Sequence, residues 1–303
     1  MKKILVPVDF SEVSAHATRF AIELAEKFEA EITLLNSVHF DYYPDHQFTS
    51  FTGVQTMMED VRNAMYQKMN EFVVQFDTRL KIRTEVNGVY LVTAVKEMTA
   101  KEGFDLVVIG TTGSSGIAEV LVGSNTEKIV RNASCPVISV PAKASIKQIK
   151  RILVPIDIRE LKHSFLEQVA YLQEKLGARL EFLWVKTPHN IENEEQVSEE
   201  IGQLIKGHHI ANFEFTIVKH VFPSDGILSR AEDSHADMIA MPTHARRGIS
   251  HWLSGSLTED TVNHIKIPVW SFKLDKKEKA VKLDSVSNAH GKAEYKKIEV
   301  LTD

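Results

Sequence analysis

The fold of this chain is indicated most strongly by the loop Gly110-Thr111-Thr112-Gly113-Ser114-Ser115-Gly116-Ile117-Ala118-Glu119-Val120-Leu121-Val122-Gly123-Ser124. The loop follows the apolar run 106–109 and precedes an amphipathic helical pattern. Glycines between a strand and a helix leave backbone N–H groups bare, and these groups bind phosphate together with the positive end of the helix. The spacing, Gly-x2-Gly-x9-Gly-Ser, therefore predicts a phosphate-binding strand–loop–helix unit.

The same loop occurs a second time, in altered form, from Pro242 to Ser256. Pro242 and Ala245 stand where the first copy has Gly110 and Gly113. Proline removes an N–H group, and alanine adds a Cβ where the backbone would approach a phosphate. We expect the first half of the chain to bind a phosphate ligand and the second half to bind one poorly or not at all. The pair 246–247, both arginine, either binds an anion through its side chains or is simply solvated.

The repeat extends over most of the chain. Residues 3–9 match 151–157, residues 105–109 match 237–241, and residues 135–140 match 267–272. The repeat predicts two tandem domains at residues 1–144 and 150–273, joined by a short polar linker. The lysine-rich tail, 274–303, lacks strong apolar periodicity, so we expect it to be mostly flexible. An extended strand around residues 295–301 that docks on a domain is the alternative.

Each half alternates short β-branched runs with helical patterns. Such continuous apolar runs are typical of parallel strands that are buried on both faces of a sheet. With helices between the strands, the pattern predicts an α/β fold made of two tandem doubly wound parallel-sheet domains with five strands each. The expected strands are 4–8, 32–38, 82–86, 106–109 and 137–140 in the first half, and 152–156, 180–185, 213–218, 238–241 and 269–272 in the second.

Two features of the first half lie between these strands. Met57, Met58, Met65 and Met69 are spaced as one helix face, which we expect to lie against the sheet. An aromatic excursion from Phe40 to Phe51 precedes them, and it fits either a lid over a site or a contact surface with the other domain. In the second half, Gly177 stands where a helix would end.

Composition excludes several classes of protein. The chain has 303 residues, 43% of them hydrophobic, and a net charge of −5, which does not favour binding to nucleic acid or to an anionic membrane. No apolar run approaches the roughly 20 residues of a membrane helix, and the N-terminal apolar stretch is too short for a signal peptide. A single cysteine, Cys135, forms no intrachain disulfide and suits a small buried position. We expect a cytoplasmic protein.

The end of the first strand carries the other candidate site residue, Asp9. In a parallel sheet, ligands bind beyond the carboxyl ends of the strands, where the strand order reverses. Asp9 and Gly110 should meet there, so that the carboxylate accepts hydrogen bonds from a ribose while the loop holds phosphates. Asp9 could instead cap the following turn or helix, although Ser11 is also available as a cap. Ser124 and Glu127 form a capping-box pattern that is compatible with an anion at the same helix end.

With these motifs, the chain resembles the universal stress protein family in its tandem two-domain form. The resemblance covers residues 1–272 and rests on Val-Pro-Val-Asp at 6–9, the glycine loop, and Cys-Pro-Val at 135–137. It implies domains of the adenine nucleotide alpha hydrolase-like, Rossmann-like fold and a stress-response or signalling protein that binds ATP or ADP through its first half. In the second half Asp157, Gly255 and Ser256 are retained, whereas Trp184 stands in place of Asn36.

The resemblance also implies which residues bind the nucleotide. Mg²⁺ or Mn²⁺ would accompany the phosphates without a protein cage, so no residue is assigned as a metal ligand. The residues implied are Gly110, Gly113, Gly123 and Ser124 for the phosphates with further contacts from Asn125 and Thr126, Asp9 for the ribose, Pro7, Val8, Ser37 and Val38 for the base, and Ile109 at the end of the fourth strand.

No sequence motif predicts an enzyme. The chain has no Gly-Lys-Ser/Thr P-loop and no recognisable catalytic triad. A binding protein is favoured, with a nucleotide-independent scaffold and a slow or self-phosphorylating ATPase as alternatives. His208, His209, His244 and His251 are too irregularly spaced to predict zinc, and surface histidines are the simpler interpretation. Subunits of this family commonly pair through their last strands, so we expect 137–140 to lie beside 269–272, with further homodimerisation as an open possibility.

Overall fold

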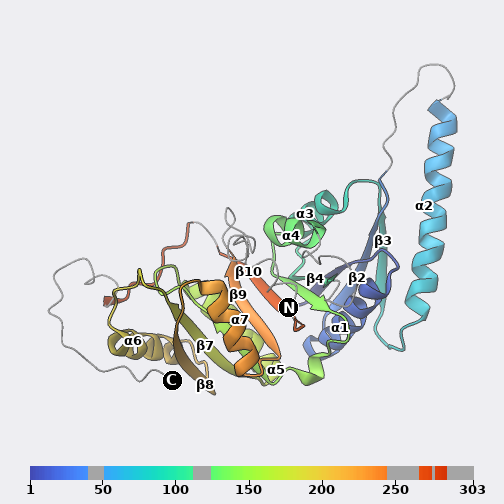
Figure 1. Cartoon of the computed structure of the whole chain (residues 1–303). Helices are drawn as coiled ribbons and strands as arrows, with labels where there is room; N and C mark the ends of the chain where they lie inside the picture. The colour runs from blue at the N-terminus through green and yellow to red at the C-terminus, as the bar shows by residue number, and fades with distance from the viewer. Residues whose placement is uncertain (40–50, 112–123, 244–265, 275–276, 285–303) are drawn as a thin grey trace.

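The computed structural model describes residues 1–39, 51–111, 124–243, 266–274 and 277–284 of the chain. Its strands form one ten-stranded sheet in the order β3-β2-β1-β4-β5-β10-β9-β6-β7-β8 (Figure 1). The elements of the first half are β1 (Lys3–Pro7), α1 (Glu12–Phe28), β2 (Glu31–Ser37), α2 (Phe51–Val74), β3 (Ile82–Asn87), α3 (Leu91–Lys101), β4 (Leu106–Thr111), α4 (Ser124–Asn132) and β5 (Val137–Pro141). They are followed by a short 3-10 helix (Ile146–Gln148), β6 (Arg151–Pro155), α5 (His163–Leu176), β7 (Arg179–Lys186), α6 (Glu194–Gly207), β8 (Phe213–Lys219), α7 (Pro223–Asp233), β9 (Met238–Thr243) and β10 (Val269–Lys273).

The two halves meet at β5 and β10, which pair antiparallel, with Trp270 opposite Ile138 and Val269 opposite Ser139. All other strand pairs are parallel. The α/β fold, the ten strand regions and the pairing of the two last strands are therefore confirmed. Because β5 and β10 run in opposite directions, the carboxyl ends of the strands in the two halves point to opposite edges of the common sheet.

Helices cover both faces of the sheet. One apolar cluster joins α1, α2, α5 and α6 on one face and runs through both halves without a break. On the other face, α3 and α4 cover the first half, and α7 covers the second half. Figure 1 shows α3 and α4 across the sheet from α1. Continuous apolar strands are buried on both sides by this arrangement, which explains their lack of polar alternation.

Local sequence explains where α1 begins and where α5 ends. Ser11 caps α1 by accepting a hydrogen bond from the backbone N–H of Ser14 at 3.2 Å. Gly177 ends α5 as predicted, because its φ of 68° is a left-handed conformation, and its N–H donates to the carbonyl of Gln173. By contrast α5 has no side-chain cap from its own N-cap residue, Lys162.

The methionine face of α2 packs only in part as expected. Met69 is fully buried against the sheet and Met65 packs beside it. Met57 and Met58 are 58% and 43% exposed, so the prediction is wrong for these two. The apolar periodicity runs through both parts of the helix, but its first turns extend past the end of the sheet (Figure 1). Residues 40–50 of the aromatic excursion lie outside the described residues.

The start of the tail, residues 277–284, contacts the second half. Glu278 accepts hydrogen bonds from the backbone N–H and the hydroxyl of Ser164, and Lys162 Nζ donates to the carbonyl of Glu278. Val281 N–H donates to Leu161 O at 2.7 Å, and Leu283 is buried. Residues 285–303, with the alternative docking strand, lie outside the description. None of the described helices combines the length and apolar character needed to cross a bilayer.

Candidate functional site

The candidate site lies where the strand order of the first half reverses. β1 is paired with β2 on one side and with β4 on the other, so the chain leaves β1 and β4 on opposite faces of the sheet. Asp9 follows β1 directly, and Gly110 lies in the last part of β4. This is the position at which parallel α/β sheets bind ligands.

Asp9 organises the turn from β1 into α1. Its Oδ1 accepts hydrogen bonds from the N–H of Ser11 at 3.0 Å and from the hydroxyl of Ser11 at 2.5 Å. Partial burial acts to raise the pKa of Asp9, but these hydrogen bonds outweigh it and lower the pKa below its usual value. The carboxylate is therefore ionised at neutral pH. The turn-capping interpretation describes what Asp9 does within the chain, and the side chain remains exposed enough to meet a ligand.

Gly110 is required by the packing of α1 on β4. A Cβ at this position would lie 2.5 Å from the carbonyl oxygen of Val13 and 2.7 Å from its Cγ1. Real Cβ atoms do not approach backbone oxygens so closely, so any other residue would push the first turn of α1 away from β4. This steric reason for the glycine needs no phosphate.

Several predicted nucleotide-binding residues belong to the core. Val8 and Ile109 are 4% and 7% exposed and pack in the two apolar clusters on opposite faces of the sheet, and Pro7 is also buried. These three can offer a ligand little more than backbone atoms. Ser37 and Val38 at the end of β2 lie toward β3, since Ser37 Oγ donates to Val89 O and Val38 N–H donates to Asn87 O at 2.9 Å.

The predicted phosphate-binding residues are described only in part. Ser124 is the first residue of α4, Asn125 is exposed, and Thr126 is 4% exposed. Glu127, the other member of the expected capping box, forms an ion pair with Arg131. Gly113 and Gly123, like Arg246, Arg247, His244 and His251 of the second copy, lie outside the described residues.

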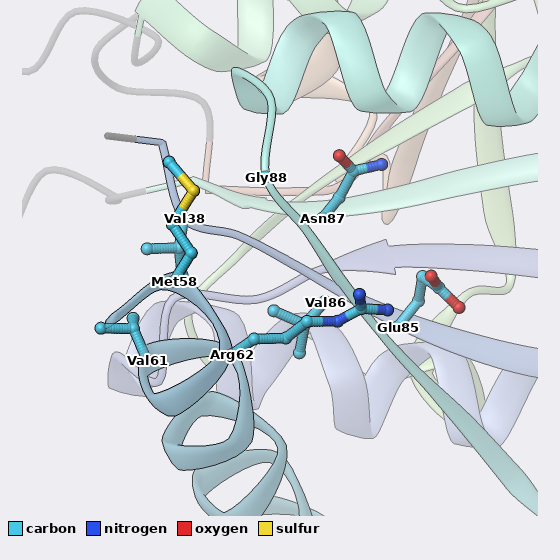
Figure 2. A pocket seen from close by; sticks show the side chains of 8 residues that line it. All are labelled: Val38, Met58, Val61, Arg62, Glu85, Val86, Asn87 and Gly88. Carbon is cyan, nitrogen blue, oxygen red and sulfur yellow. The ribbon is translucent and has the colours of Figure 1, made fainter. Parts of the chain in front are cut away.

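A pocket of about 380 Å³ lies beside Val38, between the end of β3 and helix α2. Figure 2 shows Met58, Val61 and Arg62 of α2 facing Val38 and the end of β3, with Arg62 extending across the strand toward Glu85. The lining is apolar near Val38 and polar toward β3. The ends of β4, β1 and β2 lie in a row, and the pocket lies at the next strand end along this row, that of β3.

One buried polar residue near this site was not predicted. Asn36 is 6% exposed, and its Nδ2 donates to the carbonyl of Val8 at 2.9 Å. Among the described residues, its Oδ1 has no hydrogen-bond partner. An asparagine inside the expected strand 32–38 was the available signal in the sequence, because a buried side-chain amide needs hydrogen-bond partners. The α2 residues of the pocket gave no comparable signal in the sequence.

In the second half, an ion pair forms close to the equivalent position. Asp157 Oδ1 accepts from the N–H of Arg159 at 2.9 Å, as Asp9 does from Ser11. The guanidinium of Arg159 then donates to Glu192, with Nε 2.8 Å and Nη2 2.5 Å from Oε1. Burial acts to raise the pKa of Glu192, but its hydrogen bonds and the charge of Arg159 lower it. Arg159 and Glu192 thus bond to one another next to Asp157.

Two further differences separate the halves. Trp184, buried at 2%, takes the place of Asn36, so the amide that holds the end of β1 has no counterpart. Helix α5 begins six residues after Asp157, whereas α1 begins three residues after Asp9. The later start leaves no helical first turn at the position of Val13, which is consistent with Pro242 in place of Gly110 on β9.

The remaining chemical groups of the described part offer no clear reactive centre. Burial raises the pKa of the Cys135 thiol to about 12, so it is not a nucleophile at neutral pH. Among the described residues, no group of three or more His, Cys, Asp and Glu side chains is placed to hold a metal ion. His208 pairs with His163, which was not among the histidines considered from the sequence.

Comparison with known proteins gives consistent results. The model of the universal stress protein family matches residues 1–141 and again 148–273. Universal stress protein MJ0531 of Methanocaldococcus jannaschii is 30% identical over 140 residues, which are 46% of this chain and 81% of that protein. Universal stress protein YxiE of Bacillus subtilis is 26% identical over 46% of this chain and 97% of that protein. A universal stress protein from Archaeoglobus fulgidus has the same fold, with a TM-score of 0.68 at 18% identity, over 89% of this chain and 98% of that one.

Proposed function

The chain belongs to the universal stress protein family, and from this membership we propose that its N-terminal half binds ATP or ADP in a cytoplasmic stress-response or signalling role. The C-terminal half then acts as a partner domain with an impaired phosphate loop. The observation that carries the proposal is the position of Asp9 and Gly110 at the carboxyl ends of neighbouring strands, at the reversal of strand order.

The proposed ligand lies along the row of strand ends. Phosphates bind at the loop after Gly110 and at the start of α4, where the helix dipole favours negative charge. The ribose lies at Asp9, whose ionised carboxylate is an acceptor for hydroxyl groups. The base lies beyond Val8, near Val38 and toward the pocket under α2. A nucleotide extended from β4 to β2 spans these positions in the order phosphate, ribose and base.

A bound Mg²⁺ or Mn²⁺ would neutralise phosphate charge. The described residues supply no cluster of acidic or histidine ligands for it. Such an ion would be held mainly by phosphate oxygens and water, as is usual for Mg²⁺ on nucleotides. The chain's own contribution in this proposal is to orient the nucleotide.

The second half supports a single site per chain. The Arg159 side chain is committed to Glu192 next to Asp157, and Pro242 lacks the N–H of its counterpart. A nucleotide bound at Asp157 would compete with Glu192 for the guanidinium of Arg159, which is already held in a charge-assisted hydrogen-bonded pair.

Isothermal titration with ATP tests the proposal through matched substitutions, Asp9→Ala and Asp157→Ala. Each removes the carboxylate that follows the first strand of its half and the same hydrogen bond to residue i+2. We expect Asp9→Ala to weaken ATP binding roughly 10- to 100-fold, the loss of a hydrogen bond to a charged group. Asp157→Ala should leave it unchanged.

Mass spectrometry of the ligand released from denatured protein provides the stoichiometry. One adenine nucleotide per chain is expected. Two nucleotides per chain would contradict the proposal that only the first half binds one. The absence of any nucleotide together with failed ATP titration would favour a nucleotide-independent scaffold, in which Asp9 only shapes the turn that Asp157 also makes.

A further inference from the structure

Two histidines of the second half meet outside the proposed nucleotide site. His163 is the first residue of α5, and His208 follows the last residue of α6. His163 Nδ1 lies 3.1 Å from His208 Nε2. The ring centroids are 5.1 Å apart and the ring planes are inclined by 24°, so the rings meet by their nitrogen-bearing edges rather than face to face.

The backbone fixes the tautomer of His208. Its Nδ1 lies 3.0 Å from the carbonyl oxygen of Leu204. A carbonyl oxygen only accepts, so Nδ1 carries the proton, and Nε2 of the neutral ring keeps its lone pair. That lone pair faces His163. Metal-binding histidines have the same arrangement, in which the ring nitrogen away from the metal donates to a carbonyl and thereby orients the ring.

We propose that His163 and His208 together bind a divalent transition-metal ion that prefers imidazole ligands, such as Cu²⁺. Two neighbouring equatorial nitrogens of a square-planar Cu²⁺, each about 2.0–2.1 Å from the ion, would lie about 2.8–3.0 Å apart. The observed separation of 3.1 Å must therefore decrease by only a few tenths of an ångström. His163 moves its proton from Nδ1 to Nε2, so two neutral rings bind the ion and no proton is released.

The surroundings admit a cation. His163 is exposed, His208 is half-buried, and a hollow of about 580 Å³ lined by His208 and Glu167 opens beside them. Glu278 interacts electrostatically with His163. Burial acts to raise the pKa of Glu278, but hydrogen bonds from Ser164 lower it, so Glu278 is a carboxylate at neutral pH. With two protein nitrogens, water completes the coordination of the ion.

Titration of the full chain with Cu²⁺ near pH 7.4 tests the site. The variants are His163→Gln and His208→Gln, with His189→Gln as a control because His189 is an exposed histidine of the same half. We expect one tight Cu²⁺ equivalent in the unmodified chain and in the control. Each of the other two substitutions should weaken it by at least the roughly 10- to 100-fold that loss of an outer-shell partner causes.

Electron paramagnetic resonance should show two equatorial nitrogens in the unmodified chain and fewer in both variants. Binding should weaken as the pH is lowered toward 5, because protons compete for imidazole nitrogens. Unchanged melting temperatures without Cu²⁺ would show that the variants are folded. Equal affinity in all four proteins, or an equal decrease in all three variants, would overturn the proposal and leave only dispersed binding to surface histidines.

Discussion

Gly110 occupies a position where no side chain fits, whatever the loop after it binds. The carbonyl of Val13 in the first turn of α1 lies where a Cβ would be. A glycine that a sequence pattern assigns to phosphate binding therefore has a packing reason as well, and the two reasons are separable by experiment. Gly88 offers a comparison, because a Cβ there would meet no atom within 4 Å.

Substitution of Gly110 by alanine should destabilise the fold by about 1–3 kcal/mol, the usual cost of overpacking. The added methyl meets a backbone oxygen, which moves only if α1 moves. Urea unfolding of Gly110→Ala and Gly88→Ala measures the difference, and Gly88→Ala should remain close to the unmodified chain. Equal stabilities of the two variants would mean that α1 adapts without cost.

Glu192 contributes stability that depends on pH. Its pKa is lowered in the fold, so the contribution is complete above the ordinary glutamate pKa and is lost as the pH falls through the lower folded value. Glu192→Gln should cost about 1 kcal/mol at pH 7, a modest value because the Arg159 side chain is 42% exposed. Measured between pH 3 and 7, the difference in melting temperature between the unmodified chain and Glu192→Gln should become smaller below about pH 4.5. A difference in melting temperature that does not change with pH would contradict this role for the Glu192 carboxylate.

The secondary structure elements were predictable to the extent that their patterns are local. All ten strands follow from continuous apolar runs, and the C-terminus of α5 follows from Gly177. The exposure of Met57 and Met58 was not predictable, because periodicity identifies a helix face without showing where the sheet beneath it ends. The candidate site was predictable at Asp9, which follows β1, and at Gly110, which lies near the end of β4.

Side-chain pairs between residues distant in sequence were the part that could not be predicted. Arg159 and Glu192 are 33 residues apart, and His163 and His208 are 45 apart. The first pair joins the loop before α5 to the loop before α6, and the second joins the start of α5 to the residue after α6. Each contact therefore depends on how the helices sit on the sheet. No spacing rule for side chains in one helix or strand reports such a pair.

The tail supplies α5 with the cap that its own sequence lacks. Lys162 makes no side-chain cap, whereas Glu278 accepts from the first-turn N–H and hydroxyl of Ser164. Glu278→Ala should therefore destabilise the second half by about 1 kcal/mol, as loss of an N-cap does. Thermal unfolding measures this, with Lys279→Ala as the control, since Lys279 is exposed beside it. Equal melting temperatures would indicate that the tail contact is dispensable.

The two halves share structure beyond the β5–β10 ladder. The apolar cluster under α1, α2, α5 and α6 continues through both halves. The terminal ammonium of Met1 donates to the Tyr171 hydroxyl at 2.7 Å, and Glu23 accepts from the N–H of Ile146 at 2.8 Å. The half proposed to bind the nucleotide and the half that carries the Arg159–Glu192 ion pair are thus built on one core. The second half can be retained for its packing, even where it binds no nucleotide.

This shared core predicts that the chain unfolds as one cooperative unit. Trp270 lies on β10 opposite Ile138, is 2% exposed, and stacks with Phe165 and Phe272 at centroid distances of 6.2 and 5.7 Å. Trp270→Ala should cost about 3–5 kcal/mol, because it leaves a cavity where the halves meet. Calorimetry should show a single transition in the unmodified chain that moves as a whole to lower temperature in the variant. Two calorimetric transitions, of which Trp270→Ala shifts only one, would show instead that the first half folds independently of β10.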